Sequence, residues 1–191
     1  MKYQTHFNNI TTKNHSNRGM GLENDLNETN KFYLINNIAN VHKKPTQVTI
    51  KKVDYHSKYD ALIKEAYFKT PSTTDYNGVY QGKYIDFEAK ETKLKTAFPL
   101  SNIHEHQIKH LTNIVKHGGI GFIIVRFTTL NETYILTENK LVYFQENIPK
   151  KSIPLSFFKE HGYLIKDKYC PRVDYLAIID KILEGEKNEK V

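Results

Sequence analysis

The stretch Tyr84-Ile85-Asp86-Phe87-Glu88-Ala89-Lys90 alternates polar and apolar residues, which predicts a β-strand. Successive side chains of a strand point to opposite faces, so Asp86, Glu88 and Lys90 share one face and Phe87 points to the other. Glu88 and Lys90 then lie about 6.6 Å apart along the backbone. The pattern therefore predicts an acid and an ammonium group on the same face of a sheet.

The preceding run, Asp75 to Tyr80, is predicted to be the partner strand of a β-hairpin, and two different turns would suit it. A turn at Gln81-Gly82 would place Asp75 opposite Glu88, with their Cβ atoms about 4.5–5.5 Å apart. A turn at Asn77-Gly78 is the stronger two-residue turn signal, and it would leave Glu88 without an acidic neighbour. We favour the later turn because it brings the three charged residues together.

Two carboxylates at that distance repel each other unless a cation or a proton lies between them. Mg²⁺ prefers oxygen ligands, so the pair formed by Asp75 and Glu88 predicts a magnesium site. The competing interpretation is an exposed ion pair between Glu88 and Lys90, which would contribute roughly 0–1 kcal/mol to stability and have no catalytic role.

The composition limits the class of protein. The chain has 191 residues, 39% of them hydrophobic, and a single cysteine, Cys170, which cannot form an internal disulfide. A net charge of +7 indicates a polyanionic partner, either nucleic acid or an acidic membrane surface. No apolar run approaches the roughly 18 residues needed to cross a membrane, and residues 1–16 lack the apolar centre of a signal peptide. We therefore expect a soluble, cytoplasmic protein with no membrane partner.

Along the chain, residues 1–16 are predicted to be a disordered basic arm, 17–183 a single domain and 184–191 a flexible charged tail. A helix is expected from Ile103 to His117, with an apolar stripe at Ile103, Leu111, Ile114 and Val115 and a capping box formed by Asn102 and Glu105. The other predicted elements are a helix from Met20 to Asn40, strands over 46–52, 120–127, 133–137 and 141–144, and a last helix from Val173 to about Leu183. The run 120–127 is nearly all apolar, as in a strand covered on both faces. The order predicts an α/β sandwich with a mixed sheet.

Gln107 falls inside the apolar stripe of the helix expected at 103–117. A polar side chain on a buried face needs a hydrogen-bonding partner, which can be backbone, water or a functional site.

Asp75 with Glu88-x-Lys90, on a hairpin between two helices, resembles the site of PD-(D/E)xK nucleases. The chain is more specifically similar to the RecU Holliday junction resolvases of Gram-positive bacteria, from about Asn17 to Lys181. The stretches that carry this resemblance are Asn17-Arg18-Gly19-Met20-Gly21-Leu22-Glu23, Thr73-Thr74-Asp75-Tyr76-Asn77-Gly78 and Tyr84 through Thr92. Thr74 stands where the broader nuclease pattern has a proline, a departure that the resolvases share.

The resemblance implies a restriction-endonuclease-like fold, with a mixed central β-sheet flanked by helices and a protruding stalk at about 54–69. It implies a magnesium-dependent homodimer, with Mn²⁺ as a substitute ion, that makes paired symmetric cuts in four-way junction DNA during recombination and repair, alongside recombination proteins. Carried over by position, the metal-binding residues are Thr73, Asp75, Glu88 and Gln107, and Lys90 is the transition-state stabiliser.

The predicted DNA contacts are Arg18, which flanks the start of the first predicted helix, and the basic or aromatic residues Lys58, Phe68 and Lys69 of the stalk. Phe68 could stack on unpaired bases at the crossover. Three weaker candidates remain: Glu23 as a further acid near the metal, and His106 with His110 as a pair with zinc-chelating spacing but no evident third ligand.

Two other functions stay open. One is a restriction-like endonuclease directed at duplex DNA, which would not need the basic, aromatic insertion around 54–69. The other is a non-catalytic DNA-binding protein that modulates a recombinase, in which Asp75, Glu88 and Lys90 serve only folding.

Overall fold

The computed structural model describes residues 21–45, 48–55, 61–68 and 73–188. The arm predicted at 1–16 lies outside these ranges, as do Arg18, Lys58 and Lys69. No helix within the described ranges is both long and apolar enough to cross a membrane.

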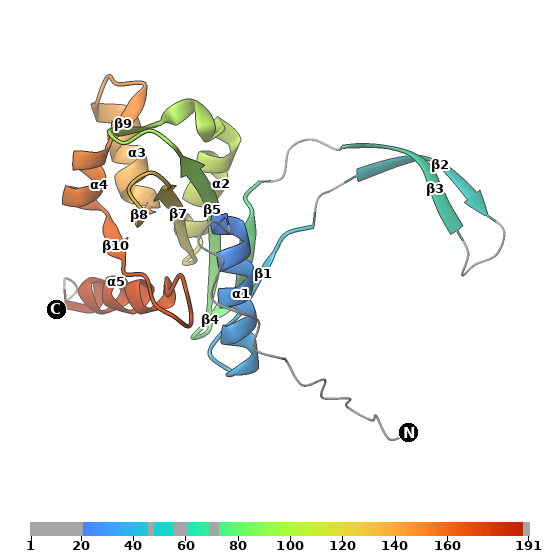
Figure 1. Cartoon of the computed structure of the whole chain (residues 1–191), viewed down its shortest axis with the longest axis horizontal. Coiled ribbons are helices and arrows are strands. Elements are labelled where there is room, and N and C mark those ends of the chain that lie inside the picture. The colour runs from blue at the N-terminus through green and yellow to red at the C-terminus, as the bar shows by residue number, and fades with distance from the viewer. Residues whose placement is uncertain (1–20, 46–47, 56–60, 69–72, 189–191) are drawn as a thin grey trace.

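A six-stranded sheet forms the centre of the molecule, with strand order β1-β4-β5-β7-β8-β10 (Figure 1). Its strands are β1 (Asn40–Lys43), β4 (Tyr76–Tyr80), β5 (Lys83–Thr92), β7 (Ile120–Phe127), β8 (Glu132–Thr137) and β10 (Tyr163–Ile165). The pair β5–β7 is parallel and the other pairs are antiparallel. The expected mixed sheet is therefore confirmed.

Helices cover both faces of this sheet. The helices are α1 (Leu22–Ile35), α2 (Glu105–Lys116), α3 (Glu138–Asn147), α4 (Leu155–His161) and α5 (Leu176–Asn188), with a short 3₁₀ helix η1 (Leu100–Asn102). Side chains of α1 and α5 pack with Ile85 and Phe87 of β5 in one core, whereas α2, α3 and α4 pack with Ile123 and Val125 of β7 in the other. The polar face of β5, which carries Asp86 and Glu88, therefore faces the α2 side.

The strand predicted at 120–127 is confirmed as β7, and Phe122 through Val125 are fully buried. The parallel crossover from β5 to β7 contains α2, which packs on the sheet through Ile108 and Leu111. Strand β7 lies inside the sheet, between β5 and β8, and contributes side chains to both cores, which is why its sequence does not alternate.

A separate two-stranded sheet, formed by β2 (Val48–Tyr55) and β3 (Ala61–Phe68), stands away from the central sheet (Figure 1). The stalk predicted at about 54–69 overlaps this hairpin, whose first strand already begins at Val48. A third small sheet pairs β6 (Ala97–Pro99) with β9 (Ser152–Pro154).

Several predicted boundaries are wrong. Residues 141–144 lie in α3 and not in a strand, since the buried residues Leu141 and Phe144 are three apart and so share one helical face. Helix α1 is shorter than predicted, and α5 continues to Asn188, so the tail expected from Glu184 begins as helix.

The start of α2 is also corrected. The predicted N-cap Asn102 belongs to η1, and the residue that caps α2 is His104. The backbone N–H of His104 donates to Gln107 Oε1 at 3.0 Å. Gln107, Ile108 and Leu111 are the buried residues of α2, whereas Val115 is 40% exposed. The prediction that Val115 belongs to the buried stripe is therefore wrong, although Gln107 does lie on the buried face.

Candidate active site

The hairpin of β4 and β5 turns at Gln81 and Gly82, which both have positive φ, of 48° and 74°. Tyr80 pairs with Lys83, and Asn77 pairs with Asp86, so the register continued past β4 places Asp75 opposite Glu88. The later of the two turns considered is thereby confirmed. Gly78 lies inside β4 against β1, where an added Cβ would come within 2.1 Å of the Asn40 carbonyl oxygen.

The three residues of the nuclease-like motif come together at this register. The backbone N–H of Ala89 donates to Asp75 Oδ2 at 3.2 Å, which holds the Asp75 side chain beside β5. The Lys90 ammonium forms an ion pair with Glu88 Oε1. Glu88 is fully buried, whereas the Lys90 side chain is 26% exposed, so the site opens to solvent on the lysine side.

Glu88 lies in surroundings that disfavour its ionised form. Burial, and then the charge of Asp75, raise the pKa of the Glu88 carboxyl to about 7, and the ion pair with Lys90 only partly offsets them. Although Lys90 lies against Oε1, neither Glu88 oxygen has a hydrogen-bonding partner of good geometry within the described part of the chain. A buried carboxylate in that condition is one that a cation would stabilise.

The donor set fits a hard divalent cation, because Asp75 and Glu88 supply carboxylate oxygens from neighbouring strands. No group of three or more His, Cys, Asp or Glu side chains is arranged as a metal cluster among the described residues. Further ligands would have to be neutral oxygens. Thr73 and Gln107 both carry one, but in this structure Thr73 Oγ1 accepts from Lys44 Nζ at 3.2 Å and Gln107 Oε1 accepts the N–H of His104.

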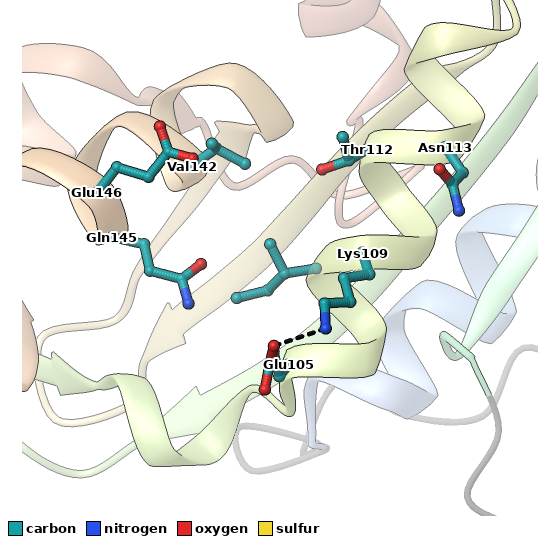
Figure 2. A pocket seen from close by; sticks show the side chains of 8 residues that line it. Glu105, Lys109, Thr112, Asn113, Val142, Gln145 and Glu146 are labelled. Carbon is teal, nitrogen blue, oxygen red and sulfur yellow. Dashed lines mark ion pairs between the residues drawn. The ribbon is translucent and has the colours of Figure 1, made fainter.

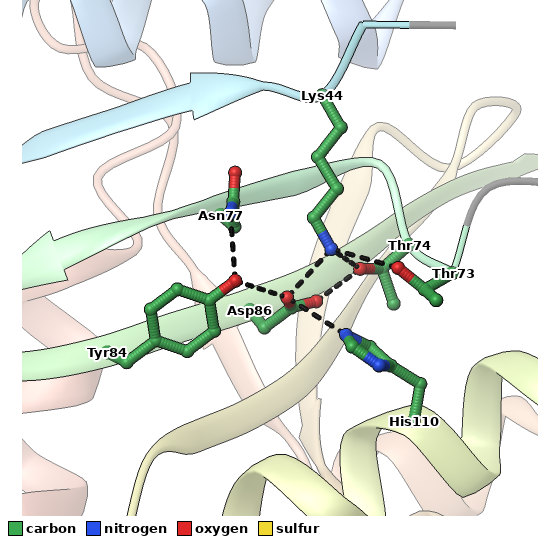
Figure 3. Close-up of polar contacts among 7 residues, drawn as sticks. All are labelled: Lys44, Thr73, Thr74, Asn77, Tyr84, Asp86 and His110. Carbon is green, nitrogen blue, oxygen red and sulfur yellow. Dashed lines mark hydrogen bonds and ion pairs between the residues drawn. The ribbon is translucent and has the colours of Figure 1, made fainter. Parts of the chain in front are cut away.

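A second polar cluster lies beside these residues, centred on Asp86 (Figure 3). Asp86 Oδ2 accepts from Lys44 Nζ at 2.7 Å, from Tyr84 OH at 3.1 Å and from His110 Nε2 at 3.1 Å, while the Thr74 hydroxyl donates to Oδ1. The sequence marked Asp86 as sharing a face with Glu88, but nothing local to it predicts Lys44 or His110 as partners. They come from a different strand end and from α2.

The weaker metal candidates, Glu23, His106 and His110, have partners other than Asp75 and Glu88. Glu23 is exposed and pairs with Lys43 at 2.5 Å. His110 contacts Asp86, whereas the ring of His106 stacks on that of His104 with centroids 5.4 Å apart, so the two histidines have different neighbours.

The candidate DNA contacts are only partly described. Phe68 ends β3 opposite Val48, and its side chain lies outside the described part of the structure. The hairpin exposes Tyr55 at 72% and Tyr67 at 58%, and Lys51 Nζ lies 5.4 Å from the centre of the Tyr67 ring.

A pocket of about 500 Å³ lies between α2 and α3, and neither Asp75 nor Glu88 lines it (Figure 2). The residues that line it are Glu105, Ile108, Lys109, Thr112, Asn113, Val142, Gln145 and Glu146. Glu105 and Lys109 form an ion pair across one turn of α2 at 2.7 Å. The nuclease-like residues do not contribute to it.

Comparison with known proteins decides the family. Residues 17–181 match the family described as Recombination protein U. The chain belongs to the RecU family. Among the relatives named "Holliday junction resolvase RecU", that of Geobacillus sp. (strain WCH70) is 56% identical over 88% of this chain and 86% of its own length. The relative of the same name from Bacillus cereus (strain B4264) is 54% identical over 91% of this chain and 88% of its own length.

The predicted resemblance to RecU resolvases is thus confirmed over nearly the whole chain. Among solved structures, the Holliday junction resolvase Hjc of Archaeoglobus fulgidus matches 74% of this chain and 91% of its own, with 12% sequence identity and a TM-score of 0.45. That likeness is too distant to bear on the function of a RecU family member.

Proposed function

We propose that this protein is a divalent-metal-dependent endonuclease that resolves four-way (Holliday) junctions in DNA recombination and repair. The observation that carries the proposal is the fully buried Glu88, opposite Asp75 and in contact with Lys90 on one face of the sheet. Membership of the RecU family, and relatives at 54–56% identity that are named Holliday junction resolvases, support the choice of junction DNA as substrate. The net charge of +7 suits a polyanion of that kind.

Asp75 and Glu88 are the proposed ligands of Mg²⁺, or of Mn²⁺ in its place, with Thr73 and Gln107 completing the set. The bound ion would act as a Lewis acid toward the phosphate and lower the pKa of a coordinated water. Gln107 Oε1 and Thr73 Oγ1 each accept one hydrogen bond in this structure, and the second lone pair of each oxygen would be available to the ion. Without the ion, the raised pKa of Glu88, about 7, means that the protonated carboxyl is still populated near neutral pH.

Lys90 has the proposed role of stabilising charge in the transition state. The Lys90 side chain is paired with Glu88 but remains partly exposed, so a phosphate could approach it from solvent. A positive charge held in place before the reaction stabilises the developing oxyanion without the cost of reorganising the site.

A homodimer would provide the two sites that paired symmetric cuts require. The hairpin β2–β3 supports this arrangement, because an isolated two-stranded sheet is marginally stable in water and this one exposes Ile50, Leu62 and Ile63. We propose that the hairpin also contacts the centre of the junction, through Phe68 and the basic residues Lys58 and Lys69, and that Arg18 binds a phosphate. The proposed setting is the cytoplasm, together with recombination proteins.

The experiment that tests the function compares a mobile four-way junction with a linear duplex of the same arm sequence. The purified protein is incubated with each DNA in Mg²⁺, in Mn²⁺ and in EDTA. We expect symmetric cuts in the junction only when the metal is present. Equal cutting of the duplex would favour the restriction-like alternative, and tight binding with no cutting in any metal would favour a non-catalytic modulator.

A further inference from the structure

Asp86 and Glu88 are both fully buried carboxylates on the same face of β5, yet their surroundings are opposite. Asp86 accepts from four donors, on Lys44, Thr74, Tyr84 and His110 (Figure 3). Glu88 has the Lys90 ion pair and no well-formed hydrogen bond within the described residues. A carboxylate whose lone pairs are already occupied is a poor ligand, so Asp86 serves a different purpose from Glu88.

Two of the donors of Asp86, Lys44 and Thr74, lie on the segments that connect the hairpin β2–β3 to the central sheet. Lys44 comes just before β2, and Thr73 and Thr74 come just after β3. The three hydrogens of the Lys44 ammonium are directed to Thr73 Oγ1 at 3.2 Å, Thr74 Oγ1 at 2.5 Å and Asp86 Oδ2. The residue that follows β1 and the two residues that precede Asp75 are therefore bonded to each other, and Lys44 and Thr74 are bonded to β5.

The segment Thr73–Asp75 needs such an anchor because it precedes β4, which begins at Tyr76. Its backbone is held by the Lys44 N–H, which donates to the Asp75 carbonyl oxygen at 2.8 Å. Its side chains are held at two points on β5: Thr74 donates to Asp86, and Asp75 accepts from the Ala89 N–H. Two of the proposed metal ligands, Thr73 and Asp75, flank the threonine that makes the first of these bonds.

We propose that Lys44, Thr74 and Asp86 form a clamp that positions Thr73 and Asp75 for metal binding, and that these three are positioning residues and not ligands. This inference rests on the proposed function for its consequence in catalysis. The clamp itself concerns only how firmly the conformation of residues 73–75 is held, with or without metal and DNA. Residues that orient metal ligands typically change metal affinity by 10–100-fold when they are removed.

The decisive variant is Thr74→Val, which keeps the shape and the charge of the site and removes only the hydroxyl. Thr29→Val is its matched control, since Thr29 is equally buried and its Oγ1 accepts from the Val173 N–H at 3.2 Å in another part of the fold. In metal-free protein without DNA, we expect faster amide hydrogen exchange at residues 73–76 in Thr74→Val only. We also expect Mn²⁺ to bind about tenfold more weakly, measured by calorimetry or electron paramagnetic resonance.

For the variant Lys44→Met, the clamp and simple electrostatics predict opposite changes in Mn²⁺ affinity. Removing a positive charge near the acids would, by Coulomb attraction alone, make Mn²⁺ bind more tightly. The clamp predicts the reverse, because Thr74 and the Asp75 segment lose an anchor. Weaker Mn²⁺ binding in both Lys44→Met and Thr74→Val supports the clamp, with cleavage recovering at high Mg²⁺ and junction affinity unchanged in Thr74→Val.

Unchanged amide exchange at 73–76 in Thr74→Val and Lys44→Met overturns the clamp, as does unchanged or tighter Mn²⁺ binding in both. A wild-type protein that cuts no junction and binds no Mn²⁺ would refute the proposed function instead. The exchange measurement would still decide the clamp in that case, because it requires neither metal nor DNA.

Discussion

At Glu88, burial and the charge of Asp75 act in the same direction, because each disfavours the ionised carboxylate. Asp86, two residues away on the same strand, is just as buried but is compensated by four donors. The contrast shows that the chemistry of a carboxylate in this site depends on its partners and not on its burial alone. It also makes Glu88 the residue where pH, metal and stability are linked.

Glu88 should make the metal-free protein less stable as pH rises. The folded state holds this proton up to about pH 7, whereas the unfolded chain releases it near 4.5, so the folded state binds more protons in this interval. Stability is therefore lost as pH increases through the interval, by up to about 3 kcal/mol. Denaturant unfolding of wild type and Glu88→Gln in EDTA, at about pH 5 and about pH 7.5, measures the difference. An identical difference between the two proteins at both pH values would contradict this linkage.

Asp75→Ala and Glu88→Ala should bind junctions but not cut them, because each removes a proposed metal ligand and neither removes a DNA contact. Lys90→Ala should raise the activation free energy by roughly 3–4 kcal/mol, which lowers the cleavage rate about 10²–10³-fold. Single-turnover cleavage and gel-shift binding give the two quantities separately. Asp180→Asn is the control, since Asp180 accepts from Tyr80 OH at 2.8 Å, away from the acids. Normal metal-dependent turnover in both alanine variants would end the assignment of the site.

Among the elements, the β4–β5 hairpin shows how a glycine can be required without being in a turn. Gly78 is paired on both sides, with Val41 of β1 and with Ile85 of β5, and its missing Cβ is what lets β1 approach. The Asn77-Gly78 pair resembles a turn signal because glycine also suits turns. Here the glycine is needed for strand packing instead.

Gly78→Ala should therefore destabilise the protein by several kcal/mol, since the new Cβ would lie 2.1 Å from the Asn40 carbonyl oxygen and force β1 away. Gly185→Ala, in α5 where nothing lies within 4 Å of an added Cβ, should stabilise it by about 0.5–1 kcal/mol. Opposite signs in denaturant unfolding are the expected result. A Gly78→Ala protein as stable as wild type would mean that β1 is not packed as described.

The β2–β3 hairpin carries the prediction about substrate choice. Phe68→Ala and Tyr67→Ala should weaken junction binding by about 1–3 kcal/mol, and duplex binding by less, because stacking needs unpaired bases. Tyr143→Ala is the control, as Tyr143 is 51% exposed but lies on α3. Equal losses of affinity for junction and duplex would show that the hairpin contributes charge or stability and not recognition of the crossover.

For the whole molecule, the proposed symmetry matters more than any single contact. One chain carries one set of acids, so two matched cuts need two chains related by a two-fold axis. The hairpin exposes the apolar side chains Ile50, Leu62 and Ile63, which a second copy could cover, and the net charge of +7 suits contact with DNA.

A mixed dimer tests this directly. When excess Glu88→Ala protein is combined with tagged wild type and the hybrid is purified, the hybrid should nick one strand of the junction and not release linear products. Sedimentation analysis should give the mass of two chains. Paired cuts by a hybrid with one intact site would contradict the two-site arrangement.

Some of this structure is determined by local pattern. The alternation from Tyr84 to Lys90 and the apolar run of β7 depend only on side-chain spacing along an extended backbone, so fold class and the shared face of Glu88 and Lys90 were predictable. The register of the hairpin needed a choice between two turns, each of which was locally acceptable.

The tertiary structure decided the rest. Lys44, Thr74, Asp86 and His110 come from separate elements and meet only after β1, β4, β5 and α2 have packed, so no local spacing reveals them. The cap of α2 at His104, and α3 in place of a strand, likewise depended on which side chains found buried partners. Interactions between residues far apart in the chain are set by packing, and that is where the clamp beside the acids originates.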